Sequence, residues 1–208
     1  MTVPALPLAG RVALVTGANH GIGASTAIAL ADLGAHVAVA YLRLPAEADD
    51  SGRPSDYREH RVQDASATLA AIDAAGERGL GIEADLADAA SPCRIFDEVE
   101  AALGAVEILV HNASGWRKDT FVPNTGDRLG RSTQPVTAET FDAQFDIDAR
   151  AGALLIAELA SRHVRRGGAW GRIISLTSGG PRGFPGEVSY GAAKAALENY
   201  TMAASIEL

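Results

Sequence analysis

The chain has 208 residues, a formal net charge of -8, 47% hydrophobic residues and 21% charged residues. This length suits a single domain, residues 1–208, and the acidic balance argues against a nucleic-acid-binding surface, which needs clustered positive charge. Cys93 is the only cysteine, which excludes an intrachain disulfide and favours a reducing compartment such as the cytoplasm. The first residues do not resemble a signal peptide, and no apolar run approaches the roughly 20 residues that cross a bilayer, so no membrane contact is expected.

Short apolar runs alternate with helical patterns along the chain. The predicted strands are Val12–Thr16, His36–Tyr41, Gly79–Ala84, Glu107–His111 and Ile173–Leu176. The predicted helices are Gly21–Leu33, Val62–Ala75, Ser91–Leu103 with Ser91 as N-cap, Ala138–Arg165 and a last helix from Ser189; 45–60 and 114–135 are predicted loops. Strand–helix alternation predicts an α/β fold, a doubly wound parallel sheet in the order 3-2-1-4-5.

A glycine-rich turn, Thr16-Gly-Ala-Asn-His-Gly-Ile-Gly23, joins the first predicted strand to the first helix. Gly17 permits a tight turn, Gly21 lets the backbone approach a pyrophosphate, and Gly23 allows close packing of helix on strand. The free N–H groups and positive dipole end of the helix favour phosphate. A plain turn is the alternative, and the strand–loop–helix context favours phosphate binding.

Tyr190 and Lys194 are four residues apart and therefore share one face of the last helix. A nearby cation favours the ionised phenolate, so this tyrosine could act as an acid and a base. Ser178 follows an apolar run at the end of the fifth strand, the edge where open α/β sheets bind ligands. The same Tyr-x-x-x-Lys spacing also arises by chance on surface helices, and the glycine loop is what strengthens it.

Together these motifs resemble the short-chain dehydrogenase/reductase family, including its 3-oxoacyl-carrier-protein reductases, with further matches at Asp85-Leu86 and Asn112-Ala-Ser114. The resemblance implies hydride transfer between a nicotinamide cofactor and a carbonyl or alcohol substrate. Tyr190 would exchange the proton, Ser178 would hold the substrate oxygen, and Lys194 would bind the nicotinamide ribose. The implied cofactor contacts, besides Tyr190 and Lys194, are Thr16, Gly17, Asn19, His20, Gly21, Ile22, Gly23, Asp85, Leu86, Asn112 and Ala113. A homodimer or homotetramer is also implied.

The end of the second strand bears on the choice of cofactor. An acid there would bind the ribose 2′-hydroxyl and repel a 2′-phosphate. The position instead carries Tyr41, with Arg43 two residues on, and no acid appears until Glu47. Arg43 could pair with a 2′-phosphate, which favours NADP(H) with NAD(H) as the alternative. The alternative is that Arg43 merely faces solvent and does not contact the cofactor.

Two features depart from the family pattern. Asp148 takes the place of the Asn that usually holds a water in the proton relay. Asp148 could order that water, pair with Lys194, or cap a local bend without taking part. The sequence also ends inside the helix that carries Tyr190. The last two family strands and the lid would then be missing, and strand five would be an exposed edge.

Two loops are candidates for the substrate side. Trp116 is predicted to form a pocket wall, whereas the cations of the same loop, Arg117, Lys118, Arg128 and Arg131, are predicted to be solvated. The segment 179–186, between Ser178 and Tyr190, is predicted to face the substrate. The five histidines are scattered and, with Cys93, make no metal-ligand spacing.

Three functions stay open: an NADP(H)-dependent oxidoreductase, a catalytically silent nucleotide-binding or interaction protein, and a sugar-nucleotide epimerase. The last shares Tyr-x-x-x-Lys but needs a substrate domain for which this sequence has no room.

Overall fold

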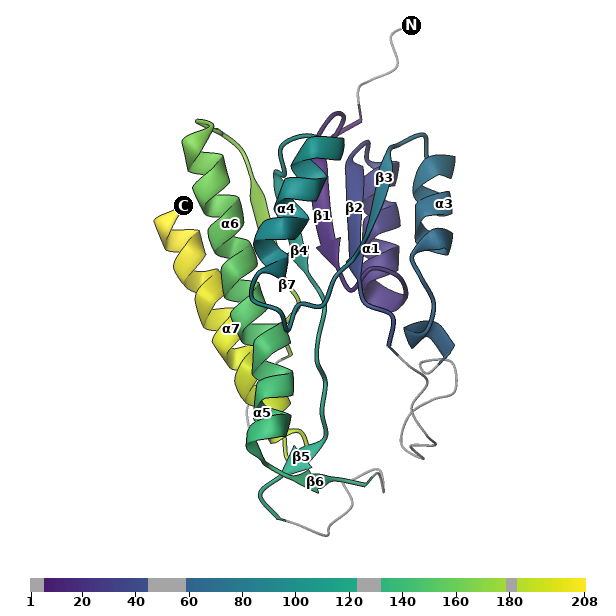
Figure 1. The fold of residues 1–208 in the computed structure, drawn as a ribbon. Coiled ribbons are helices and arrows are strands. Elements are labelled where there is room, and N and C mark those ends of the chain that lie inside the picture. Colours follow the sequence, from purple (N-terminus) through teal and green to yellow (C-terminus); the bar gives the residue numbers. More distant parts are fainter. Residues whose placement is uncertain (1–5, 45–58, 123–131, 179–182) are drawn as a thin grey trace, which may run out of the picture.

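The computed structural model describes residues 6–44, 59–122, 132–178 and 183–208 (Figure 1). Five strands form a sheet: β1 (Val12–Thr16), β2 (His36–Tyr41), β3 (Gly79–Glu83), β4 (Ile108–His111) and β7 (Arg172–Ser175). All neighbours are parallel, in the order β3-β2-β1-β4-β7. Because β7 is the fifth strand of this sheet, the predicted doubly wound α/β fold with order 3-2-1-4-5 is confirmed.

Helices cover both faces of the sheet. The helices are α1 (Gly21–Asp32), α3 (Ser66–Ala74), α4 (Ser91–Ala102), α5 (Ala138–Phe145), α6 (Ala151–Arg165) and α7 (Val188–Glu207). Successive strand residues point to opposite faces, so Ala13 and Val15 of β1 pack toward α1 and α3, whereas Val12 and Leu14 pack toward α4 and α6. This two-sided burial explains why the apolar run of β1 shows no hydrophobic–polar alternation.

The segment between β4 and α6 differs most from the prediction. The predicted loop contains two short parallel strands, β5 (Asp119–Thr120) and β6 (Gln134–Pro135), and the predicted long helix is interrupted by a π-helical turn, η1 (Asp146–Arg150). A π turn adds one residue to a single turn and is often found at functional sites. Hydrophobic periodicity cannot reveal it, because the helix continues on both sides.

Two helix starts also differ from the prediction. Ser91, predicted as an N-cap, is the first residue of α4, and the N-cap is Ala90. Helix α3 begins at Ser66, where Asp64 Oδ1 accepts the backbone N–H at 2.9 Å. Most of the predicted excursion at 45–60 lies outside the described residues. Among the residues that the structure does describe, no helix is long and apolar enough to span a membrane.

Candidate functional site

The glycine loop between β1 and α1 is held in place from the end of β4. Thr16 is buried, and its Oγ1 accepts the N–H groups of Asn112 and Ala113, each at 3.1 Å. The Asn112 side chain donates from Nδ2 to the carbonyl oxygens of Thr16 and Gly17, at 3.1 and 2.9 Å. Gly17 has φ +62°, and a Cβ on Gly23 would collide with the Gly17 carbonyl oxygen. The two glycines therefore permit a tight turn with α1 packed directly against it.

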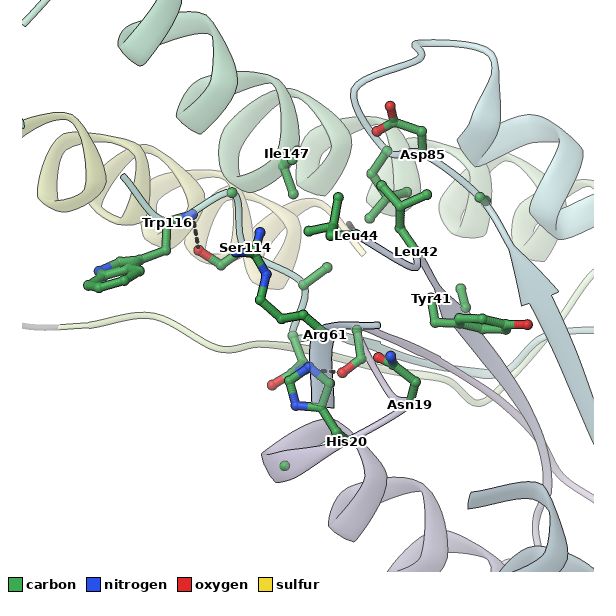
Figure 2. Close-up of a pocket in the computed structure, with 18 of the residues that line it drawn as sticks. Asn19, His20, Tyr41, Leu42, Leu44, Arg61, Asp85, Ser114, Trp116 and Ile147 are labelled. Atoms are coloured by element: carbon green, nitrogen blue, oxygen red, sulfur yellow. Dashed lines mark hydrogen bonds between the residues drawn. The ribbon is translucent and has the colours of Figure 1, made fainter. Parts of the chain in front are cut away.

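A cavity of about 390 Å³ opens at the carboxyl ends of the strands, between the glycine loop and the segment after β4 (Figure 2). Open α/β sheets bind ligands at this edge, and pockets for small molecules usually measure about 300–1,000 Å³. Ten of the predicted cofactor residues line the cavity: Gly17, Asn19, His20, Gly21, Ile22, Tyr41, Asp85, Leu86, Asn112 and Ala113. Thr16 and Gly23 shape the loop without being part of the cavity wall.

Other lining residues were missed by the sequence analysis. Leu42, Leu44, Arg61 and Ile147 all contribute to the wall. Arg61 lies 20 residues beyond the end of β2, so no local pattern points to it. Trp116, predicted to be a pocket wall, lines this same cavity (Figure 2).

Arg43 does not line the cavity and pairs with Glu83 at the end of β3. Its Nε and Nη2 atoms lie 3.0 and 2.7 Å from the two carboxylate oxygens of Glu83. Hydrogen bonding and charge attraction from Glu83 raise the pKa of Arg43, and the hydrogen bond from Arg43 lowers the pKa of Glu83. Both side chains are exposed, but Arg43 is not among the residues that line the cavity.

Lys194 is buried in α7 with its charge engaged by two oxygens. Its Nζ lies 2.8 Å from Oδ1 of Asp148 and donates to the Leu176 carbonyl at 2.9 Å. The same Nζ is 5.7 Å from the centre of the Tyr190 ring. The structure therefore brings the predicted tyrosine and lysine together on one side of α7 and adds the carboxylate of Asp148.

Asp148 lies on the π turn η1 and connects Lys194 to the cavity wall. Its Oδ2 accepts the Gly115 N–H at 2.9 Å, the Gln144 Nε2–H at 2.5 Å and the Ser114 hydroxyl at 3.1 Å. Ser114 and Gly115 themselves line the cavity. Of the three roles left open for Asp148, the structure contains the ion pair with Lys194.

Tyr190 and Ser178 lie in different surroundings. The Tyr190 ring packs edge-to-face on Phe184, with ring centres 5.6 Å apart. Ser178, which follows β7, lines a separate hollow. Phe184 and two residues of α7, Gly191 and Ala195, also line this hollow. Residues 179–182, part of the predicted substrate-side loop, lie outside the described residues, as do Arg128 and Arg131.

His111 is buried beneath the glycine loop and is uncharged near neutral pH. Burial lowers its pKa to about 4. Its Nδ1 lies 3.0 Å from Thr16 Oγ1, which already accepts two N–H groups and so directs its own proton to the ring. The ring hydrogen therefore lies on Nε2. In the described part of the chain, no three His, Cys, Asp or Glu residues gather to hold a metal ion.

Comparison with known proteins places this geometry in a family. A family model described as enoyl-(acyl carrier protein) reductase matches residues 17–208. The "NADPH-dependent aldehyde reductase-like protein, chloroplastic" of Arabidopsis thaliana is 35% identical over 207 residues, which cover 99% of this chain and 69% of that protein. The chain belongs to the short-chain dehydrogenase/reductase family. The predicted resemblance is thus confirmed.

Two further members of the short-chain dehydrogenase/reductase family illustrate how much of a relative this chain covers. Hydroxynaphthalene reductase arp2 of Aspergillus fumigatus is 34% identical over 197 residues, covering 94% of this chain and 60% of that protein. The crystal structure of a 3-oxoacyl (acyl-carrier-protein) reductase from Agrobacterium tumefaciens C58 with NADP bound superposes with a TM-score of 0.74. It is 25% identical and covers 98% of this chain and 66% of that one. The chain thus spans roughly two thirds of the length of these family members.

Proposed function

We propose that the chain binds NADP(H) in the cavity and takes part in hydride transfer between this cofactor and a carbonyl or alcohol substrate, with Tyr190 as the general acid and base. The observation that carries this proposal is the set of contacts from Lys194 through Asp148 to Ser114 and Gly115. These contacts connect the helix of the tyrosine to the wall of the cavity.

The residues present fit a dinucleotide. The Gly17 turn and the missing Cβ of Gly23 leave the backbone of the loop open to the approach of a pyrophosphate. The start of α1 adds N–H groups and the positive end of a helix dipole. Asp85 and Leu86, after β3, line the part of the cavity where the adenine would lie. NADP is favoured because two family members carry NADP or NADPH in their descriptions.

The side chains divide the chemistry in a simple way. The nicotinamide ring supplies or accepts the hydride when it is bound. In the reduction direction, the Tyr190 hydroxyl donates a proton to the substrate oxygen, and the Lys194 ammonium lies 5.7 Å from the centre of the tyrosine ring. For Ser178 to donate a hydrogen bond to the same oxygen, the substrate has to extend into the hollow that Ser178 lines. Two N–H groups of Lys194 are used by Asp148 and Leu176, which leaves the third for a ribose hydroxyl.

A catalytically silent nucleotide-binding protein is the second candidate. The burial of Lys194, only 3% exposed, and its engagement by partners within the protein favour this alternative. An ammonium held in this way stabilises the fold whether or not it acts on a substrate.

The two candidates are separated by measuring binding and turnover on the same protein. NADPH binding is followed by its fluorescence, and NADPH oxidation is followed with a panel of ketones, for the wild type and for Tyr190→Phe. The oxidoreductase predicts turnover that Tyr190→Phe abolishes while NADPH affinity is kept. Binding without turnover supports the silent protein, and no NADPH binding contradicts both.

A further inference from the structure

We infer that Arg61, together with His20 and His60, forms the subsite for the 2′-phosphate of NADP(H), and that Arg43 at the end of β2 does not. The inference rests on the proposed function only in so far as the cavity binds a nicotinamide dinucleotide. It assigns the choice between NADP(H) and NAD(H) to a segment far from β2 in the sequence.

The backbone around Arg61 is fastened to the end of β2. The Leu44 N–H donates to the Arg61 carbonyl at 2.9 Å, and Leu44 continues the chain from β2. The Asn19 side chain donates from Nδ2 to the Gln63 carbonyl at 2.9 Å, which ties the same segment to the glycine loop. Residues 61–63 therefore bridge the two elements between which a dinucleotide places its adenine ribose.

The Arg61 side chain lines the cavity, as do His20 and Leu44 (Figure 2). Figure 2 shows it between His20, on the glycine loop, and Ser114, after β4. A guanidinium offers planar, paired donors that match a phosphate, and it stays charged at all physiological pH values. Arg61 thus brings a permanent positive charge to the cavity wall beside the glycine loop.

Two histidine side chains lie next to each other beside Arg61. The rings of His20 and His60 stack with centres 5.8 Å apart and planes 19° apart. Burial is the largest cause that lowers the pKa of His20, and repulsion from His60 and Arg61 lowers it further. The three basic groups therefore interact electrostatically with one another. A phosphate dianion placed beside His20 would favour the protonated form of its ring and pair with the Arg61 guanidinium.

Arg43 is unsuited to the same task. Its guanidinium is already held in a fork by Glu83, and the nearby Asp64 also raises its pKa. A phosphate at this place would meet the negative charges of Glu83 and Asp64. Arg43 does not line the cavity either, and its charge is balanced by Glu83 at the end of β3.

The test compares cofactor affinity in two arginine variants, Arg61→Gln and, as a matched control, Arg43→Gln. Dissociation constants for NADPH and NADH are measured by calorimetry. We expect Arg61→Gln to weaken NADPH binding by about 10-fold or more and to change NADH binding by less than about twofold, since one charged hydrogen bond is lost. Arg43→Gln should leave both affinities within about twofold.

A second measurement isolates the phosphate and does not involve nicotinamide. Adenosine 2′,5′-bisphosphate and adenosine 5′-monophosphate differ only in the 2′-phosphate, and wild-type protein should prefer the bisphosphate. Arg61→Gln should remove most of this preference, and His60→Gln should remove a smaller part.

Equal loss of NADPH and NADH binding in Arg61→Gln, or a selective loss of NADPH binding in Arg43→Gln, would overturn the inference. Wild-type protein that binds NADPH and NADH equally would overturn it too, and the proposed dinucleotide site would stand. Binding of neither cofactor by the wild type would instead contradict the proposed function itself.

Discussion

The ammonium of Lys194 lies 2.8 Å from the carboxylate of Asp148, and neither side chain is more than 4% exposed. A buried ion pair pays a large desolvation cost and persists only where its remaining donors and acceptors are satisfied. Here Asp148 also accepts hydrogen bonds from Gly115 and Gln144, and Lys194 also donates to the Leu176 carbonyl. The pair therefore depends on both partners, and the loss of either one leaves a charge without compensation.

Removing the carboxylate should strongly destabilise the protein. In Asp148→Ala the Lys194 ammonium stays buried without its counter-ion, which predicts a loss of about 3–5 kcal/mol in the free energy of unfolding. Urea denaturation measures this change. The double variant Asp148→Ala/Lys194→Met is the control, because it removes both charges and should recover part of the loss. A single variant within about 1 kcal/mol of the wild type would contradict the prediction, since such a value is typical of exposed pairs.

A milder change at the same position tests a role in catalysis. Asp148→Asn keeps the size of the side chain but loses the charge. Its amide N–H₂ group is a donor and would face other donors, either on Lys194 or on Gly115 and Gln144, where the carboxylate accepts hydrogen bonds. Asn is also the residue that usually stands at this position in the family, so the variant asks whether this chain depends on the charge of Asp148. If the carboxylate holds Lys194 for proton exchange at Tyr190, turnover should fall by about 10-fold or more while NADPH affinity is kept. Steady-state kinetics and NADPH titration together measure this. Unchanged turnover would show that the charge of Asp148 is not needed for catalysis.

The buried imidazole of His111 predicts a loss of stability in acid. Burial lowers its pKa from 6.5 to about 4, so between these two values the unfolded chain takes up a proton that the folded protein does not. The contribution of neutral His111 to the free energy of unfolding is complete above about pH 6.5. It is lost as the pH falls toward about 4, by about 3 kcal/mol in total. Urea denaturation over this range should show a smaller decrease for His111→Asn than for the wild type. Parallel curves for the two proteins would exclude His111 as the cause.

How far the sequence predicted the structure depends on how local each signal is. The strand Val12–Thr16 and the turn at Gly17 were predictable, because an uninterrupted apolar run and a glycine with positive φ are encoded in adjacent residues. The spacing of Tyr190 and Lys194 was predictable for the same reason, because it lies within five consecutive residues. The place of Arg61 was not, because it depends on one backbone hydrogen bond to Leu44, on the far side of a long excursion.

The π turn and the loop contacts were invisible for related reasons. The π turn that contains Asp148 changes the helix by one residue and leaves the apolar pattern intact on both sides. The predicted loop 114–135 gave no role to Asp119, yet this residue is fully buried. Its partner Ser189 lies 70 residues away, and no spacing rule connects the two.

Asp119 should be a positioning residue for the helix that carries Tyr190. Its Oδ1 accepts the backbone N–H of Ser189 at 2.9 Å, and its Oδ2 accepts the hydroxyls of Ser189 and Thr140, at 2.5 and 3.0 Å. Because Tyr190 is the next residue, loss of this carboxylate frees the start of α7 and leaves buried donors unsatisfied. We expect Asp119→Ala to lower the free energy of unfolding by about 2–3 kcal/mol, and Asp119→Asn, which keeps an acceptor oxygen, to recover part of it.

The matched control for this prediction is Asp64, an exposed aspartate that accepts the backbone N–H of Ser66 at the start of α3. Asp64→Ala removes one exposed hydrogen bond before the first turn of α3 and should cost only about 0.5–1 kcal/mol. Urea denaturation compares the free energies of unfolding of the two alanine variants. The turnover number shows whether the loss of Asp119 also displaces Tyr190. Turnover should fall in Asp119→Ala below its melting range, with recovery in Asp119→Asn, and stay unchanged in Asp64→Ala. Equal effects of the two alanine variants would mean that Asp119 is an ordinary helix cap, without influence on Tyr190.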